Sequence, residues 1–246
     1  MKPFLPKAAL AALVLALPGG SLALQGQILL AGFEFSDAPL RSEGVVASTS
    51  TAETGVFGGT ATVANPAVDR GFAELAASVG GESIAQISNV NNTVIGAEYF
   101  QFVINFGGVA ASEITFDELV FSGRTGIEWN ADGTLGTYAG GRASRMVLRS
   151  DLDGYTTDID GVVSPSFGNT DTAWATTIFD LSALSLTGTE TEITFRAYVA
   201  TTVLTGTQFH RTQLNSVELI GIPEPRVYAA LFGLLALGFV AWRRRR

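Results

Sequence analysis

The chain of 246 residues has no cysteine and a single histidine, His210. Without cysteine there is no disulfide, no thiolate nucleophile and no cysteine metal site, so a folded domain depends on its hydrophobic core alone. One histidine excludes a zinc site built on three histidines, and a Ser-His-Asp triad would depend on His210. The composition therefore argues against an enzyme of the commonest metal-dependent or nucleophilic classes.

Lysine occurs only at Lys2 and Lys7, and five of the arginines follow residue 225. Residues 24–222 therefore keep eight arginines against 22 acidic residues, a net charge of about −14. Such a surface repels nucleic acid, and it repels anionic polysaccharide unless cations bridge the two. Without lysine this part of the chain also lacks the usual phosphate-binding loop. We expect no nucleic-acid partner.

The first 23 residues have the parts of a secretory signal peptide. After the two lysines, an apolar stretch of ten residues (8–17) is too short to span a bilayer, and Pro-Gly-Gly at 18–20 breaks it. Ser21 and Ala23 place small side chains at the two positions that signal peptidase reads. We predict a signal helix that is cleaved after Ala23, with an uncleaved membrane helix as the alternative.

The C-terminal end, residues 223–246, has three parts in order. Pro223, Glu224 and Pro225 form an extended junction, because each proline lacks an N–H and biases the preceding residue away from helix. The apolar run 227–242 would reach about 24 Å as a helix, slightly less than a ~30 Å hydrocarbon core. The chain ends on four arginines, which are costly to move through a bilayer and predict a cytoplasmic C-terminus: Arg243, Arg244, Arg245 and Arg246.

This order of motif, apolar run and basic end resembles the PEP-CTERM sorting tail of exported bacterial proteins. The resemblance implies export across the inner membrane of a Gram-negative-type bacterium and transient anchoring by one transmembrane helix over 227–242. It also implies that an exosortase cuts near 223–225 and passes the body to the cell surface or the medium. A plain C-terminal anchor that is never cut is the alternative.

Residues 24–222 have the patterning of one all-β domain. Apolar side chains alternate along several segments, as in Phe100, Phe102 and Ile104, which is typical of half-buried antiparallel strands. The alternation changes phase at Asp117 and Glu118, which predicts a bulge. A short helix fits the spacing within 66–79. The expected strands are 28–35, 44–50, 60–64, 84–90, 95–106, 113–122, 142–150, 174–180, 191–200 and 212–220.

Many short strands separated by glycine-rich turns favour an antiparallel two-sheet sandwich of jelly-roll or lectin-like type. The segments 179–182, 192–198 and 214–221 are similar to the closing strands of jelly-roll bodies that precede such tails. Those bodies usually have aspartate before the asparagine of the final strand, where this chain has Leu214 before Asn215. That difference puts in doubt any site carried over from those families.

Four aspartates within ten residues form the densest polar cluster of the chain. Their carboxylates could supply oxygen ligands for a calcium ion, although the spacing is not that of an EF-hand. The alternative is a solvated hairpin, with strands 146–150 and 155–159 around a turn at 151–154. The four candidate calcium ligands are Asp151, Asp153, Asp158 and Asp160.

Trp129 is the candidate sugar-binding residue, because it lies in a polar, turn-rich segment where an aromatic ring can stack on a sugar. Trp174 belongs to an alternating segment and is expected in the core.

The function favoured by these observations is an exported, non-catalytic protein of the cell surface or extracellular matrix, associated with exopolysaccharide in a biofilm. Its expected partners are signal peptidase, an exosortase, the inner membrane and polysaccharide, with no required cofactor. A carbohydrate-binding module of lectin-like fold is the alternative, and a glycan-active enzyme is the least favoured reading.

Overall fold

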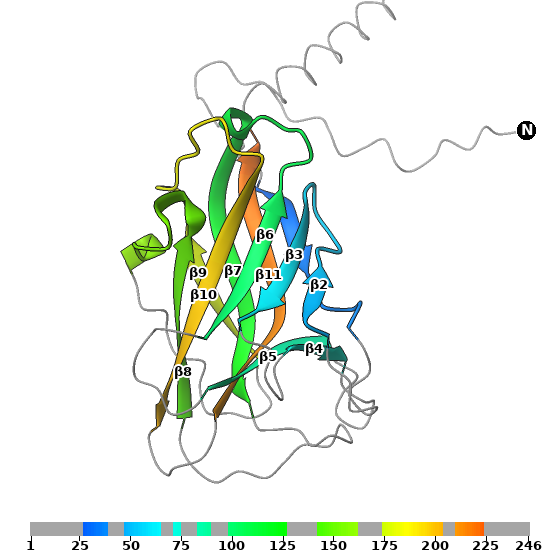
Figure 1. Ribbon diagram of the computed structural model, residues 1–246, viewed down its shortest axis with the longest axis vertical. Helices are drawn as coiled ribbons and strands as arrows, with labels where there is room; N and C mark the ends of the chain where they lie inside the picture. The colour runs from blue at the N-terminus through cyan, green and yellow to red at the C-terminus, as the bar shows by residue number, and fades with distance from the viewer. Residues whose placement is uncertain are drawn as a thin grey trace, which may run out of the picture.

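The computed structural model describes residues 27–38, 47–64, 71–74, 83–89, 98–126, 142–161, 174–203 and 210–223. Two antiparallel sheets pack face to face and enclose one hydrophobic core (Figure 1). The predicted all-β antiparallel sandwich is therefore confirmed. Among these described ranges, no helix is long and apolar enough to cross a membrane. The predicted signal helix and the predicted transmembrane helix lie outside them.

The first sheet has the strand order β4-β5-β11-β7-β9, and β1 also pairs with β11. The last strand, β11, lies in its centre: β7 lines one side over nearly its whole length, while β5 and β1 share the other. The strands are β1 (Ile28–Phe33), β4 (Gly71–Glu74), β5 (Ser83–Asn89), β7 (Ile114–Gly126), β9 (Ala175–Asp180) and β11 (His210–Pro223).

The second sheet has the order β2-β3-β6-β10-β8 and lies in front of the first in Figure 1. From β5 onward, each strand along the chain belongs to the opposite sheet from the one before it. The strands are β2 (Thr49–Thr51), β3 (Gly58–Val63), β6 (Tyr99–Asn105), β8 (Arg142–Ser150) and β10 (Glu192–Val203).

Phenylalanine fills the space between the sheets. Phe102 of β6 contacts Phe33 of β1 and Phe121 of β7, with ring centroids 5.3 and 5.8 Å apart, so it joins the two sheets. The predicted alternation of β6 and β10 is confirmed, because alternate residues of both strands belong to the core between the sheets, although Thr194 and Tyr198 on the other face of β10 are buried too. Ten phenylalanines of the described ranges are almost completely buried: Phe33, Phe35, Phe72, Phe100, Phe102, Phe106, Phe116, Phe121, Phe179 and Phe195.

The predicted bulge is present at Asp117. Glu118 pairs with Ile220 and Phe116 pairs with Gly221, so Asp117 is the extra residue on β7. Its carboxylate accepts a hydrogen bond of 2.5 Å from the side chain of Gln27. This contact connects the bulge to the segment just before β1.

Two local predictions were wrong. The segment 155–159 is not a hairpin strand: after β8 the chain forms the short 3₁₀ helices η4 (Asp151–Asp153) and η5 (Ile159–Gly161), and the partner of β8 is β10. In the predicted helix over 66–79, the described part is the strand β4, where Phe72 packs on Phe35 with ring centroids 5.2 Å apart. Tertiary pairing overrides the helical spacing there. A further 3₁₀ helix, η3 (Ala111–Glu113), precedes β7.

The first and last described strands end side by side. Ile28, at the start of β1, pairs with Gly221 near the end of β11. The chain therefore enters and leaves the sandwich at the same end, and β11 runs directly into Pro223.

Candidate ligand-binding face

The outer face of the second sheet carries a cluster of arginines and tyrosines. On β6, β10 and β8 the residues that alternate with the buried core positions point away from the first sheet. Tyr155, in the turn after η4, adds its ring to this cluster. We call the cluster the Arg–Tyr face, and its residues are Tyr99, Gln101, Arg149, Tyr155, Arg196 and Tyr198.

Arg196 lies at the centre of this face. Its guanidinium carbon is 3.8 Å from the centre of the Tyr155 ring and 4.5 Å from that of Tyr99. Its Nε donates a hydrogen bond of 2.9 Å to the side-chain oxygen of Gln101. Partial burial disfavours the charged form, but the hydrogen bond with Tyr198 and the electrostatic effect of the neighbouring tyrosines together outweigh it, so the pKa of Arg196 is raised. The group is therefore charged and held in a defined plane.

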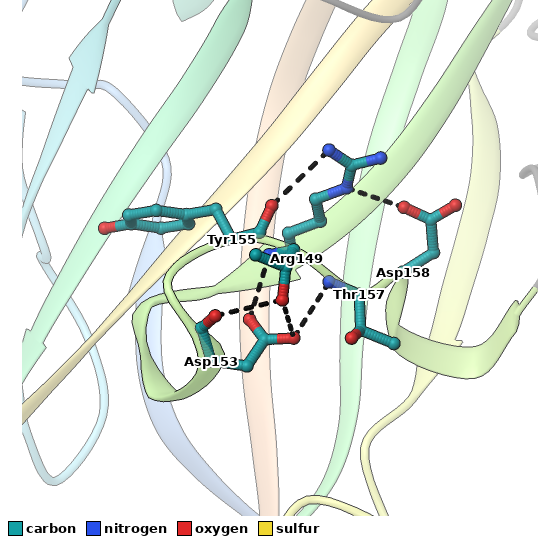
Figure 2. Close-up of polar contacts among 6 residues, drawn as sticks. Arg149, Asp153, Tyr155, Thr157 and Asp158 are labelled. Carbon is teal, nitrogen blue, oxygen red and sulfur yellow. Dashed lines mark hydrogen bonds and ion pairs between the residues drawn. The ribbon is translucent and has the colours of Figure 1, made fainter.

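Arg149 is directly opposite Arg196 in the register of β8 and β10. Its Nε makes an ion pair of 2.6 Å with Asp158, and its Nη1 donates to the Tyr155 carbonyl at 3.4 Å (Figure 2). Like charges at directly opposed positions of neighbouring strands are destabilising unless anions compensate them. Asp158 compensates one of the two charges.

Tyr155 has a strained backbone that places its ring over Arg196. Its φ is +63°, which costs a non-glycine residue roughly 1–2 kcal/mol. Gly154 before it also has a positive φ, and the Tyr155 N–H donates to the Ser150 carbonyl at 2.9 Å. Partial burial raises the pKa of the Tyr155 hydroxyl, which stays protonated. The turn therefore serves to position this ring.

A groove of about 420 Å³ lies beside this turn, between residues 150–160 and residues 180–185. Leu152, Ile159 and Leu184 give it an apolar floor, and these side chains also pack on the core. Four carboxylates line it: Asp153, Asp158, Asp160 and Asp180.

The four candidate calcium ligands each accept a hydrogen bond from the protein. Asp153 accepts hydrogen bonds from the Thr156 and Thr157 N–H groups at 3.2 and 2.8 Å (Figure 2). The pKa of Asp153 is lowered by hydrogen bonds, of which the one from the Thr157 side chain contributes most. Asp151 and Asp160 accept backbone N–H groups at 3.0 and 3.4 Å, and Asp158 accepts from Arg149. Within the described part of the chain, no three acidic, histidine or cysteine side chains are grouped so that they could hold a metal ion.

Calcium binding by these aspartates stays a prediction that a chelator tests. Because each carboxylate has a donor within the protein, we expect EDTA to leave the melting temperature of the purified protein unchanged. A fall of several degrees that added Ca²⁺ reverses would instead establish a structural calcium ion.

Most other predicted site residues lie outside the described residues. These are Ser21, Ala23, Trp129, Glu224, Pro225 and the arginines 243–246. Pro223 is the last residue of β11 and pairs with Ile114. Trp174, expected in the core, is instead half-buried just before β9, with the Arg124 guanidinium 4.0 Å from its ring centre.

Sequence reasoning did not identify the Arg–Tyr face. Arg196 and Tyr198 occupy the outward positions of a strand whose alternation was recognised, and that position is the one available signal. Their partners Gln101 and Arg149 become neighbours only through strand pairing, across 95 residues in the case of Gln101.

No family model matches the chain, and no curated protein matches it. The structure has a weak likeness to the crystal structure of a provisionally assigned glycoside hydrolase from Bacteroides vulgatus. The TM-score is 0.39 at 10% sequence identity, over 79% of this chain and 99% of that chain. At these values the likeness supports no conclusion about the activity of this chain.

Proposed function

We propose that this is an exported, non-catalytic protein of the cell surface or extracellular matrix, sorted by an exosortase, whose sandwich holds polysaccharide through the Arg–Tyr face. The observation that carries the proposal is the half-buried platform of Tyr99, Tyr155, Arg149 and Arg196, packed around the buried Tyr198, on an otherwise acidic domain. Aromatic rings and guanidinium groups fixed on a sheet are suited to sugar rings and their substituents.

The sorting part of the proposal depends on the two ends of the chain. Residues 1–23 provide the signal for signal peptidase, and residues 223–246 provide the exosortase motif, the membrane helix and the basic stop. Both attachments leave the sandwich at one end, since Ile28 pairs with Gly221. The Arg–Tyr face lies along the side of the sandwich, so anchoring at that end leaves it accessible to polymer outside the inner membrane.

We further propose the jelly-roll topology within the sandwich. Strands β5 to β11 alternate between the two sheets, in which their orders are β5-β11-β7-β9 and β6-β10-β8. Crossing between sheets at each connection is the pattern expected of a double-sheet jelly roll.

A lowered pKa at two carboxylates of the groove, Asp153 and Asp180, supports a non-catalytic role for these two groups. A general acid at neutral pH needs a carboxyl group of raised pKa. Hydrogen bonds from Thr157 and Ser182 lower the pKa of Asp153 and Asp180, respectively. Outside the groove, hydrogen bonds lower the pKa of Glu190 to about 2, and the largest contribution comes from the Thr187 side chain. These three groups are acceptors that stay ionised at neutral pH, so none of them suits the role of general acid in a glycan-cleaving enzyme.

Polysaccharide retention tests the proposed function. In affinity electrophoresis through gels that contain neutral or acidic bacterial polysaccharides, we expect the full-length protein in mild detergent to be retarded by at least one polymer. Removing the Tyr99 ring in Tyr99→Ala should weaken retardation about tenfold, since the ring both contacts ligand and orients Arg196.

The matched control is Ile178→Ala, which removes an exposed side chain from β9 in the other sheet. It should migrate as the unmodified protein does. Equal migration of all three proteins in every gel would contradict binding through this face.

A further inference from the structure

We infer that Arg196 is the recognition point for a carboxylate on an acidic sugar, so that the Arg–Tyr face selects glycans built from uronic acid units. The inference rests on the proposed polysaccharide-binding function and names the chemical class of its ligand. It is carried by the partners of Arg196, by its neighbour Arg149 and by the geometry of the two stacked rings.

Within the described part of the chain, the partners of Arg196 are all neutral. It contacts the rings of Tyr99 and Tyr155 and donates to Gln101 and Tyr198, and no carboxylate pairs with it among the residues that the structure describes. A guanidinium has five N–H donors, so these contacts leave some of them unused. In a domain with 22 acidic residues, a central arginine with neutral partners is a site prepared for an external anion.

The stacked rings determine how that anion can approach. Tyr155 and Tyr99 lie against the plane of the Arg196 guanidinium, and its Nε donates to Gln101, so an anion can approach in the plane from the side of the terminal nitrogens. A carboxylate matches the edge of a guanidinium with two parallel N–H···O bonds. A planar carboxylate on a pyranose ring therefore fits this site, with the sugar ring beside the tyrosines.

Arg149 gives a second reason for an anion here. It faces Arg196 across the β8–β10 pair, and the carboxylate that pairs with it among the described residues, Asp158, comes from the loop rather than from the sheet. A ligand carboxylate on the outer face, between the two arginine side chains, would offset the repulsion that the two guanidinium groups now leave. The strained φ of Tyr155 is then explained as the cost of holding Arg196 in the binding orientation.

The acidic carboxylates around the face limit the form of the ligand. Asp158 is neutralised by Arg149, and Asp151 accepts the Thr194 N–H at the edge of the face. The net charge of the whole domain repels a long polyanion at low salt. A short oligomer at moderate ionic strength is therefore the appropriate probe.

The test compares trigalacturonate with its methyl ester by isothermal titration calorimetry on the full-length protein in mild detergent. The ester keeps the sugar rings and removes the charge. We expect the acid to bind about tenfold or more tightly than the ester, the effect of a lost charge-assisted hydrogen bond. Arg196→Gln should weaken binding of the acid by the same factor and leave binding of the ester unchanged. The affinity of Arg196→Lys for the acid should fall between those of the unmodified protein and Arg196→Gln, because lysine keeps the charge but lacks the planar fork.

Arg145→Gln is the matched control, since it removes the same charge from an outward position of β8 and should change affinity less than twofold. If the acid and the ester bind equally, the inference is overturned while the proposed function stands. If the protein binds neither probe and no polysaccharide retards it, both are overturned. The comparison of acid with ester uses the unmodified protein, so it decides the question even where an Arg196 variant fails to fold.

Discussion

Replacing Phe102 by alanine is expected to lower the free energy of unfolding by about 3–5 kcal/mol. The ring is 1% exposed and contacts Phe33 and Phe121 of the opposite sheet, so its removal leaves a cavity at the junction of the two sheets. No disulfide can compensate, because the chain has no cysteine. For a domain of this size the melting temperature should fall by roughly 6–20 °C.

The control for this prediction is Val103→Ala on the same strand. Val103 is the next residue and points to the outer face, where a cavity cannot form. Thermal unfolding followed by circular dichroism measures both variants. A loss for Phe102→Ala no larger than that for Val103→Ala would contradict the description of a core shared by the two sheets.

Replacing Gly55 by alanine is expected to lower the free energy of unfolding by at least about 2–3 kcal/mol. Gly55 has a φ of +106°, a conformation that alanine rarely adopts. An added Cβ would lie 2.6 Å from the Leu30 carbonyl oxygen and 2.8 Å from the Ala31 backbone nitrogen. Both obstacles are backbone atoms, so β1 or the turn must move.

That turn connects the two sheets, which is why the effect should be large. It joins β2 to β3 in the second sheet, and the Gly32 N–H of β1 donates to the Thr54 carbonyl at 2.8 Å. Gly58→Ala is the matched control, because its added Cβ would meet nothing within 4 Å. Urea unfolding of the two variants should show a much lower midpoint for Gly55→Ala, and equal midpoints would contradict the packing of this turn on β1.

Much of the architecture could be predicted from the sequence because it depends on local periodicity. The alternation of Phe100, Phe102 and Ile104 identified a half-buried strand, and the phase change at Asp117 identified a bulge. The segment 155–159 was expected as the second strand of a hairpin, but Tyr155 has a positive φ and the loop forms 3₁₀ turns instead. The conformation of that segment is determined by turn geometry, which depends on contacts with β8 and β10.

The candidate site was less predictable for a physical reason. The aspartate cluster is continuous in sequence and was found easily, yet its carboxylates bond to neighbouring threonines, to Arg149 and to backbone amides rather than gathering as one metal site. The Arg–Tyr face combines residues of β6, β8 and β10 with a loop tyrosine. Only the register of those strands brings Gln101, Arg149 and Arg196 into one row.

The central claim is that a signal peptidase and an exosortase process the two ends and release the sandwich outside the inner membrane. The intact mass of the protein recovered from cells and medium tests it most directly. The account predicts a chain that begins at Leu24 and ends near residues 223–225. Recovery of the complete 25.8 kDa chain from the cell interior would contradict it.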